Sequence, residues 1–384
     1  MIAASLRNYL PIVLFVILIR GLVSIAAMAG ANLLQLPADV QRGAFGVDPR
    51  FVPGVWVRFD SGYYLGIAAN GYSYQGQELA FFPLYPLLVR AVAIVGGPVL
   101  LVWAGFVVSN IAYLLGTLVL WRLLKNDHGT AIAWGTAVSL AVFPTSLFFS
   151  AVYTESLFFL LSVLVYVLSV RKRFAAAGIV VSLASLTRVT GLLLAIIPLV
   201  ELVQDRRTRS VRRVCITGFL SSVGLAGYMW YLWVFHGSPF AFVAAQSYWK
   251  KTIVWPWQSV ADSLGVVANG LGGFQTNWFM RVVSAEDLMA ALLFLACTGV
   301  GLFVLRPSLS LYATAAIVLL LVDHGPYTFG LWSMSRYVLG LFPCFIVMAI
   351  VLSKARQLRL AAWGVSSVLM LFLAAWFGGG RWVA

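Results

Sequence analysis

Apolar residues dominate this chain in runs about 20 residues long, which is the length of a helix that crosses a bilayer. Short segments of alternating polarity, typical of membrane β-barrels, do not occur in the sequence. The pattern predicts an all-α polytopic membrane protein. Spanning helices are expected over 9–30, 98–121, 130–150, 154–170, 174–187, 190–204, 214–235, 287–305, 308–323, 335–353 and 360–377.

Two longer segments, 31–97 and 236–285, mix polar and aromatic residues and are expected to be loops of a single transmembrane domain, 1–384. Within the first, the stretch 81–97 is apolar but contains Pro83 and Pro86, which we expect to break and tilt a helix. This stretch is either a further span or a helix that lies at the membrane interface.

The basic residues favour the interfacial interpretation. If 81–97 does not cross, more than half of the 26 lysines and arginines fall in short cytoplasmic loops, among them the clusters at 171–173 and 206–213. If it does cross, both clusters lie outside, against the positive-inside rule. The sequence therefore predicts eleven spans, with the N-terminus inside and the C-terminus outside.

Composition supports a membrane protein and narrows its partners. Of the 384 residues, 62% are hydrophobic and 10% are charged, whereas a soluble domain carries about 25% charged residues. The net charge of +14 is explained by orientation and by anionic lipid, so no nucleic-acid partner is expected. We interpret the first apolar run as an uncleaved helix rather than a signal peptide.

The predicted orientation places many of the remaining ionisable residues at the outer face. Ionisable groups at membrane depth are costly and usually functional, so their gathering on one side indicates a site. Motifs of soluble enzymes are missing, and three histidines without partnered spacing argue against a metal cluster. The outer-face residues are Asp60, Glu155, Arg188, His236, Lys250, Lys251, Asp323, His324 and Arg336.

Residues 56–72, WVRFDSGYYLGIAANGY, hold the first candidate group. Asp60 stands between Arg58 and a run of aromatic residues, where a carboxylate could act as a general base. The alternative is a helix cap, because Asp followed by Ser-Gly is a good N-cap. Spacing alone favours the cap.

The other candidates each have an equally simple structural explanation. Glu155 opens a helix, where the helix dipole favours any carboxylate. Arg188 and Arg336 could each bind a phosphate or extend toward lipid headgroups. Residues 235–251, which include His236 and Lys250, could form an interfacial helix with an aromatic belt.

Several of these segments together resemble the PIG-V-type mannosyltransferases, a branch of the multispanning glycosyltransferases of the GT-C fold. The family has an RWD-type motif in the first outer loop, followed by an IA-x-x-GY run. Here these are Arg58-Phe59-Asp60, with Phe59 in place of the usual Trp, and residues 67–72. Further segments follow in the family's order: 81–88, 153–156, 187–191, 237–249 and 336–343.

The resemblance implies a reaction outside the cytoplasm, in the cell membrane. A polyprenyl-phosphate-linked mannose would donate its sugar, with inversion, to a hydroxyl of a lipid-linked acceptor. Asp60 maps onto the catalytic base. No cofactor is expected, and we find no adjacent acidic pair of the kind seen in several other GT-C branches, so one carboxylate would have to suffice.

The remaining site residues divide into two sets by expected role. The residues expected to bind the phosphate or the sugar of the donor are Arg58, Glu155, Arg188, Lys250 and Arg336. An acceptor or lipid groove is expected at Trp56, Tyr63, Tyr64, Tyr85, His236 and Trp249.

Two alternatives stay open. A flippase or transporter of polyisoprenoid lipids would also explain the spans and the outer charges, but it predicts polar residues near the membrane midplane, where only Arg20 is clearly charged. A GT-C transferase of another sugar fits the same motifs. The acceptor is not identified by the sequence.

Overall fold

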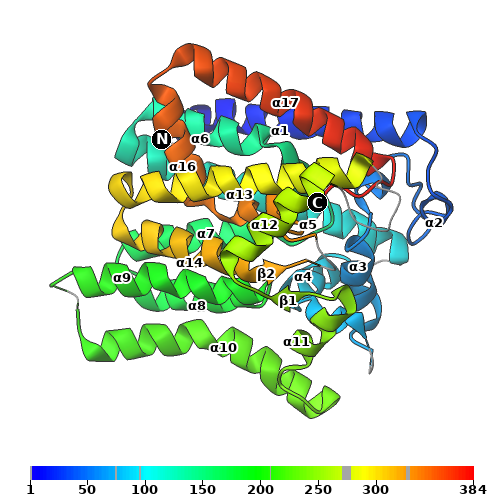
Figure 1. Ribbon diagram of the computed structural model, residues 1–384. Helices are drawn as coiled ribbons and strands as arrows, with labels where there is room; N and C mark the ends of the chain where they lie inside the picture. Colours follow the sequence, from blue (N-terminus) through cyan, green and yellow to red (C-terminus); the bar gives the residue numbers. More distant parts are fainter. Residues whose placement is uncertain (1, 74–75, 95–96, 208, 270–277, 326–328) are drawn as a thin grey trace. The chain divides into compact units, whose positions relative to one another are not determined.

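The computed structural model describes residues 2–73, 76–94, 97–207, 209–269, 278–325 and 329–384, and nearly all of its regular structure is helical (Figure 1). The chain divides into two compact units, each assembled from segments far apart in sequence. The first comprises Met1–Gly71, Pro83–Leu164 and Met348–Val383, and the second comprises Tyr72–Phe82 and Val165–Val347. That the whole chain is one transmembrane domain stays a prediction.

The first unit contains long helices and a group of short elements around the first polar segment. Helix α7, Glu155–Val170, begins in it, and α16, Phe342–Ser353, ends in it. Its other elements are α1 Ile2–Leu33, α2 Ala38–Gln41, η1 Gly54–Trp56, α3 Ser61–Asn70, α4 Leu84–Val92, α5 Pro98–His128, α6 Thr130–Val142, η3 Pro144–Phe149 and α17 Arg356–Gly378, where η marks a 3₁₀ helix.

The second unit combines antiparallel helices with one very short β-ladder. Strands β1, Thr252–Ile253, and β2, Asp323–His324, pair antiparallel, with Thr252 opposite His324. Its helices are η2 Gln77–Ala80, α8 Phe174–Ser185, η4 Val189–Ala195, α9 Ile196–Gln204, α10 Val211–His236, α11 Ala241–Ala245, η5 Gln246–Trp249, α12 Pro256–Asn269, α13 Trp278–Val304, α14 Pro307–Val322, α15 Met334–Tyr337 and η6 Val338–Gly340.

A helix begins or runs at every predicted span, which confirms the all-α polytopic fold. Among the described residues, five helices are long and apolar enough to cross a membrane alone: Asn8–Leu33, Pro98–His128, Val211–His236, Met280–Val304 and Arg356–Gly378. The bent pair Met334–Gly340 and Phe342–Ser353, with an angle of 88°, would make a sixth. The other apolar helices have 10–17 residues, so the count of eleven spans stays a prediction.

The stretch 81–97 contains only the nine-residue helix α4 among its described residues. At 1.5 Å per residue this helix is roughly 13 Å long, well short of a hydrocarbon core of about 30 Å. The expectation that the two prolines break a helix was wrong. Pro83 is the N-cap of α4 and Pro86 lies in its first turn, where no hydrogen bond is lost.

Helix pairs in both units approach closely at small residues. In the first unit α1 and α17 lie side by side (Figure 1), and a Cβ on Gly30 would lie 1.8 Å from the carbonyl oxygen of Ala375. In the second unit, a Cβ on Gly224 of α10 would lie 2.1 Å from the carbonyl oxygen of Ser182 in α8. Small residues allow such close backbone packing in membrane helices.

The predicted span 130–150 is interrupted at Pro144, where α6 ends and η3 begins. The break leaves carbonyl groups without helical partners. Arg20 of α1 satisfies two of them: its Nη2 donates to the carbonyl of Ala141 at 2.8 Å and its Nη1 to that of Ser146 at 2.6 Å. The buried charge of Arg20 is therefore part of the helix packing.

Candidate active site

In the first unit, the motif Arg58-Phe59-Asp60 forms the turn between η1 and α3. Phe59 has φ +47, a left-handed conformation that is uncommon for residues other than glycine. The turn is closed by Ser61, whose Oγ accepts from the Arg58 N–H and donates to the Trp56 carbonyl, both at 3.3 Å. Hydrogen bonds thus hold the backbone on both sides of Phe59.

Asp60 occupies the N-cap position of α3, but its side chain makes no capping hydrogen bond. Its backbone N–H donates to the Tyr153 hydroxyl at 3.2 Å, and that hydroxyl donates to the Arg58 carbonyl at 3.2 Å. The side chain is half-buried. The alternative explanation of Asp60 as a helix cap therefore lacks the hydrogen bond on which it depends.

Arg58 is bonded differently from what the sequence predicted. Its guanidinium is buried and donates to four backbone carbonyls, those of Gly54, Val57, Pro49 and Gly378, at 3.0, 2.9, 2.6 and 2.9 Å. Burial lowers its pKa to about 10, so it stays charged at neutral pH. These bonds make Arg58 a brace for the Asp60 turn and do not support a place on the donor phosphate.

The aromatic residues around this turn are mostly packed in the interior. Trp56 and Tyr85 have no exposed surface and Tyr64 has 7%, whereas Tyr63 is half-buried. Tyr85 donates to the Gly105 carbonyl at 2.9 Å. Their place in an acceptor groove stays a prediction, and in this structure three of the four rings serve packing.

Glu155 is the first residue of α7 and is 2% exposed. The positive end of the helix dipole favours a carboxylate there. The residue before it, Thr154, lies 3.5 Å from the Tyr64 hydroxyl through its Oγ1. Glu155 thus lies near the same aromatic residues as the Asp60 turn.

In the second unit, three cations surround one tyrosine ring. The guanidinium carbons of Arg188 and Arg336 lie 5.3 and 4.9 Å from the centre of the Tyr337 ring, and Lys251 Nζ lies 5.3 Å from it. Arg336 Nη2 also donates to the Tyr337 hydroxyl at 3.1 Å. We call Arg188, Lys251, Arg336 and Tyr337 the cation cluster.

Lys251 has a carboxylate partner, Asp323, at 2.6 Å. Burial lowers the pKa of Lys251, but Tyr337 and Asp323 together outweigh this effect, so its pKa is raised above the ordinary value. Lys251 therefore carries its charge throughout the physiological range. Three cations beside this carboxylate leave an excess of positive charge, which suits an anion of phosphate type.

The cluster forms because α12 and α13 hold the segment that precedes Arg336. Ser263 of α12 accepts from the Leu331 N–H at 2.8 Å and donates to the Phe329 carbonyl at 3.0 Å. Gly330 between them has φ +69, and a Cβ there would lie 2.3 Å from the Ser259 carbonyl oxygen. Asp287 of α13 accepts from the Ser335 N–H at 2.7 Å, in the first turn of α15.

Sequence reasoning missed several members of this arrangement. Lys251 belongs to the cation cluster, whereas the sequence predicts donor binding at its neighbour Lys250, which is exposed and has φ +50. The role of Lys250 stays a prediction. Tyr337 lies in the family segment 336–343, but no role of its own is expected for it from the sequence. The expectation that the chain has no adjacent acidic pair was wrong, because Glu286 and Asp287 are neighbours in α13.

The other predicted residues of the second unit lie on neighbouring elements. Trp249 packs against Phe81, with ring centres 5.7 Å apart, and His236 packs against Tyr231 at 5.8 Å. His324 pairs with Asp262 of α12 at 2.9 Å. The assignment of Trp249 and His236 to a groove stays a prediction.

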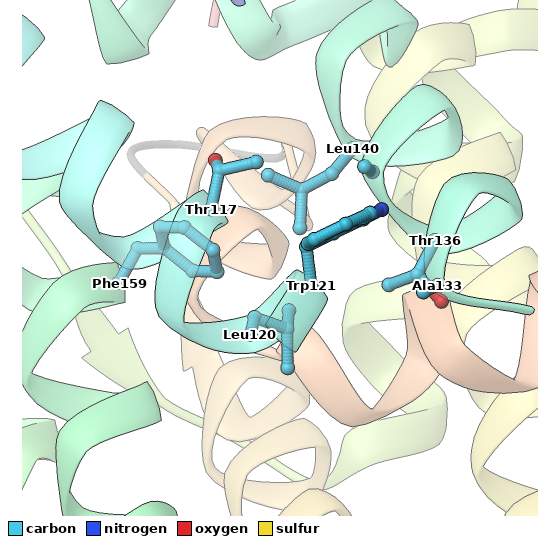
Figure 2. Close-up of a pocket in the computed structure, with 8 residues that line it drawn as sticks. Thr117, Leu120, Trp121, Ala133, Thr136, Leu140 and Phe159 are labelled. Atoms are coloured by element: carbon cyan, nitrogen blue, oxygen red, sulfur yellow. The ribbon is translucent and has the colours of Figure 1, made fainter. Parts of the chain in front are cut away.

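The first unit also contains a small cavity between α5, α6 and α7 (Figure 2). Its volume of about 10 Å³ is room for about one water, whereas ligand pockets measure about 300–1,000 Å³. None of the predicted site residues lines it. Within the described ranges, no group of three or more His, Cys, Asp or Glu could hold a metal ion.

Known proteins share both the sequence pattern and the fold of this chain. GPI mannosyltransferase 2 of Cryptococcus neoformans is 30% identical over 147 residues, 35% of this chain and 34% of that protein. The protein of the same name from Yarrowia lipolytica is 31% identical over 182 residues, 47% of this chain and 50% of that protein. The chain thus matches half or less of the length of these relatives.

The structure of ArnT from Cupriavidus metallidurans bound to undecaprenyl phosphate superposes with a TM-score of 0.53 at 14% identity, over 91% of this chain and 63% of that one. This likeness supports the GT-C-like fold. A profile of the family described as Mannosyltransferase (PIG-V) matches residues 9–255, more than half of the chain. The chain belongs to the PIG-V mannosyltransferase family.

Proposed function

We propose that this protein is a glycosyltransferase of the membrane that moves mannose from a polyprenyl-phosphate donor to a hydroxyl of a lipid-linked acceptor. The main support for this proposal is the position of Asp60. It is the acid of the family motif, it is half-buried, and it stands on a turn that Arg58, Ser61 and Tyr153 brace with hydrogen bonds. A carboxylate that the backbone positions in this way is suited to general-base work.

The reaction requires one proton transfer and one substitution. The Asp60 carboxylate takes the proton of the acceptor hydroxyl while that oxygen forms a bond to the anomeric carbon of mannose. The bond from this carbon to the phosphate oxygen breaks, and the polyprenyl phosphate leaves with the electron pair. Attack opposite the leaving group inverts the anomeric centre.

The leaving phosphate needs charge stabilisation rather than an acid. The cation cluster of the second unit offers Arg188, Lys251 and Arg336, and a guanidinium fork matches phosphate oxygens in geometry. The ArnT structure was determined with undecaprenyl phosphate, which supports a lipid-phosphate donor for a chain of the same fold. We assign phosphate binding to the cation cluster and place the reaction on the non-cytoplasmic face of the cell membrane.

The transporter alternative predicts polar residues near the membrane midplane, where Arg20 is the clear charge in the sequence. Arg20 instead donates to the carbonyls of Ala141 and Ser146 and to the Ser146 hydroxyl, and its guanidinium faces the Tyr113 ring. These partners give it a role in helix packing, and they favour the enzyme over the transporter.

The proposal is tested by a transfer assay with the purified protein in lipid. Polyprenyl-phosphate mannose with a labelled sugar is mixed with a lipid-linked mannoside or glycolipid acceptor, and the label on the acceptor is measured. The same donor carrying glucose or aminoarabinose tests the choice of sugar. Transfer of mannose supports the proposal, whereas movement of the intact donor across vesicles without transfer would replace it by the transporter.

A further inference from the structure

Phe59 combines a left-handed backbone conformation with aromatic contacts to the C-terminal segment of the chain. A left-handed conformation at a residue other than glycine persists only where the surroundings impose it. Phe59 is 38% exposed, and other aromatic rings contact its side chain. Two of them come from the end of α17 and the segment after it: the ring of Trp382, edge-on at 4.9 Å and 83°, and that of Phe377 at 5.9 Å.

The segment that carries Trp382 is itself well defined. After α17 the Gly380 N–H donates to the Phe377 carbonyl at 2.9 Å, and the Arg381 N–H donates to the Trp376 carbonyl at 3.2 Å. Gly380 has φ +73, and a Cβ there would lie 2.8 Å from the Pro37 ring. This turn directs Trp382 back onto Phe59 rather than onward along the helix axis.

The same segment holds the other side of the motif. The Gly378 carbonyl accepts from the Arg58 guanidinium at 2.9 Å, across 320 positions of sequence. Residues 377–382 therefore contact both residues that precede Asp60, one through a hydrogen bond and one through aromatic rings. Asp60 follows directly, and its direction depends on the φ of Phe59.

We infer that Trp382 is a positioning residue for the Asp60 base, and that it acts through the Phe59 ring. The inference rests on the proposed function, because it concerns the geometry of that base. A general base loses rate steeply when it is displaced by a fraction of an ångström to about 1 Å. Trp382 holds the Phe59 ring, the ring holds the left-handed backbone, and the backbone aims the carboxylate.

The test is a double-mutant cycle in the transfer assay. Trp382→Ala is expected to lower kcat about 10- to 100-fold, with donor KM within about twofold, because the geometry of the base changes and donor binding does not. Trp382→Phe keeps an edge-on ring and should recover most of the rate. Trp103→Ala removes an exposed indole of α5 in the same unit and serves as the matched control, with kcat unchanged.

The cycle is completed in the Asp60→Asn background, with rates expressed per folded protein. If Trp382 acts through Asp60, then Trp382→Ala costs nothing further there, because the base is already absent. An equal loss in both backgrounds, or full activity of Trp382→Ala, would overturn the inference. Near-normal transfer by Asp60→Asn alone would instead overturn the proposed function, so the two failures are distinguishable.

Discussion

At the scale of single residues, the role of a side chain follows from its partners more than from its charge. Arg58, Arg188 and Arg336 are equivalent candidates in the sequence. The structure bonds Arg58 to four carbonyls and places Arg188 and Arg336 around Tyr337. The difference could not be predicted, because one partner of Arg58 is the carbonyl of Gly378, at the far end of the chain.

Arg58→Ala is expected to destabilise the protein while leaving the affinity of folded protein for the donor phosphate unchanged. Removing the guanidinium leaves four buried carbonyls without its donors, and each loss costs about 1–3 kcal/mol. The midpoint of thermal unfolding in detergent measures the effect. If Arg58→Ala has normal stability but binds the donor more weakly, Arg58 would instead be a ligand of the donor phosphate.

Two adjacent lysines offer a matched pair for the phosphate site. Lys251→Ala is expected to weaken binding of polyprenyl phosphate at least about tenfold, because it removes a charge next to Arg336 and Tyr337. Lys250→Ala, which removes an exposed charge, should change binding less than about twofold, because exposed charges interact weakly. Equal effects of the two substitutions would contradict the assignment of phosphate binding to the cation cluster.

Lys251 should itself add no pH dependence to this binding in a defined range. The pKa of Lys251 is raised, so its charge is complete below the ordinary lysine value and is lost only as pH rises through the higher value. Lys251 should therefore cause no loss of phosphate affinity between about pH 7 and pH 9. The prediction is contradicted if the affinity of the wild type changes between about pH 7 and pH 9 and Lys251→Arg removes that change.

At the scale of elements, the helices could be predicted and their irregularities could not. A run of about 20 apolar residues indicates a helix wherever it occurs. The break at Pro144 and the bend of 88° before α16 were not expected from hydropathy, because both lie inside apolar runs. The pairing of β1 with β2 was not expected from the sequence either. It brings Lys251 to Asp323 across 72 positions, and two-residue strands leave no pattern in a sequence.

Gly330→Ala tests whether α12 orders the segment before Arg336. Alanine at φ +69 is strained, and its Cβ would lie 2.3 Å from the Ser259 carbonyl oxygen, so the segment should shift and donor binding should weaken. Gly265→Ala, in α12 itself, meets nothing within 4 Å and is expected to be neutral or slightly stabilising. Equal donor affinity in Gly330→Ala and Gly265→Ala would show that the segment before Arg336 does not contribute to donor binding.

At the scale of the whole molecule, the sequence predicted the class of protein and the family, and both are confirmed by the helical fold and the match over 9–255. The orientation in the membrane stays a prediction that rests on charge bias. Burial decides which positions suit a labelling test: Ser61 is fully buried and would label poorly, whereas Gly62 and Arg171 are exposed.

Orientation is measured by cysteine labelling in sealed vesicles, after Cys215, an exposed cysteine, is replaced by serine. Gly62→Cys is expected to label from outside and Arg171→Cys only after the vesicles are opened. Labelling of both from the same side would contradict the assigned topology and the non-cytoplasmic location of Asp60.

The role of Asp60 as the base of a mannosyl transfer is tested by comparing the wild type with Asp60→Asn. Purified wild type and Asp60→Asn are assayed for transfer from labelled polyprenyl-phosphate mannose at matched amounts of folded protein. Asn is nearly isosteric, and any helix cap would survive the change at little cost. If Asp60 is the base, Asp60→Asn binds the donor normally and loses roughly two to four orders of magnitude in turnover. Near-normal transfer by Asp60→Asn would contradict this role, and Glu155 would then be the next carboxylate to replace.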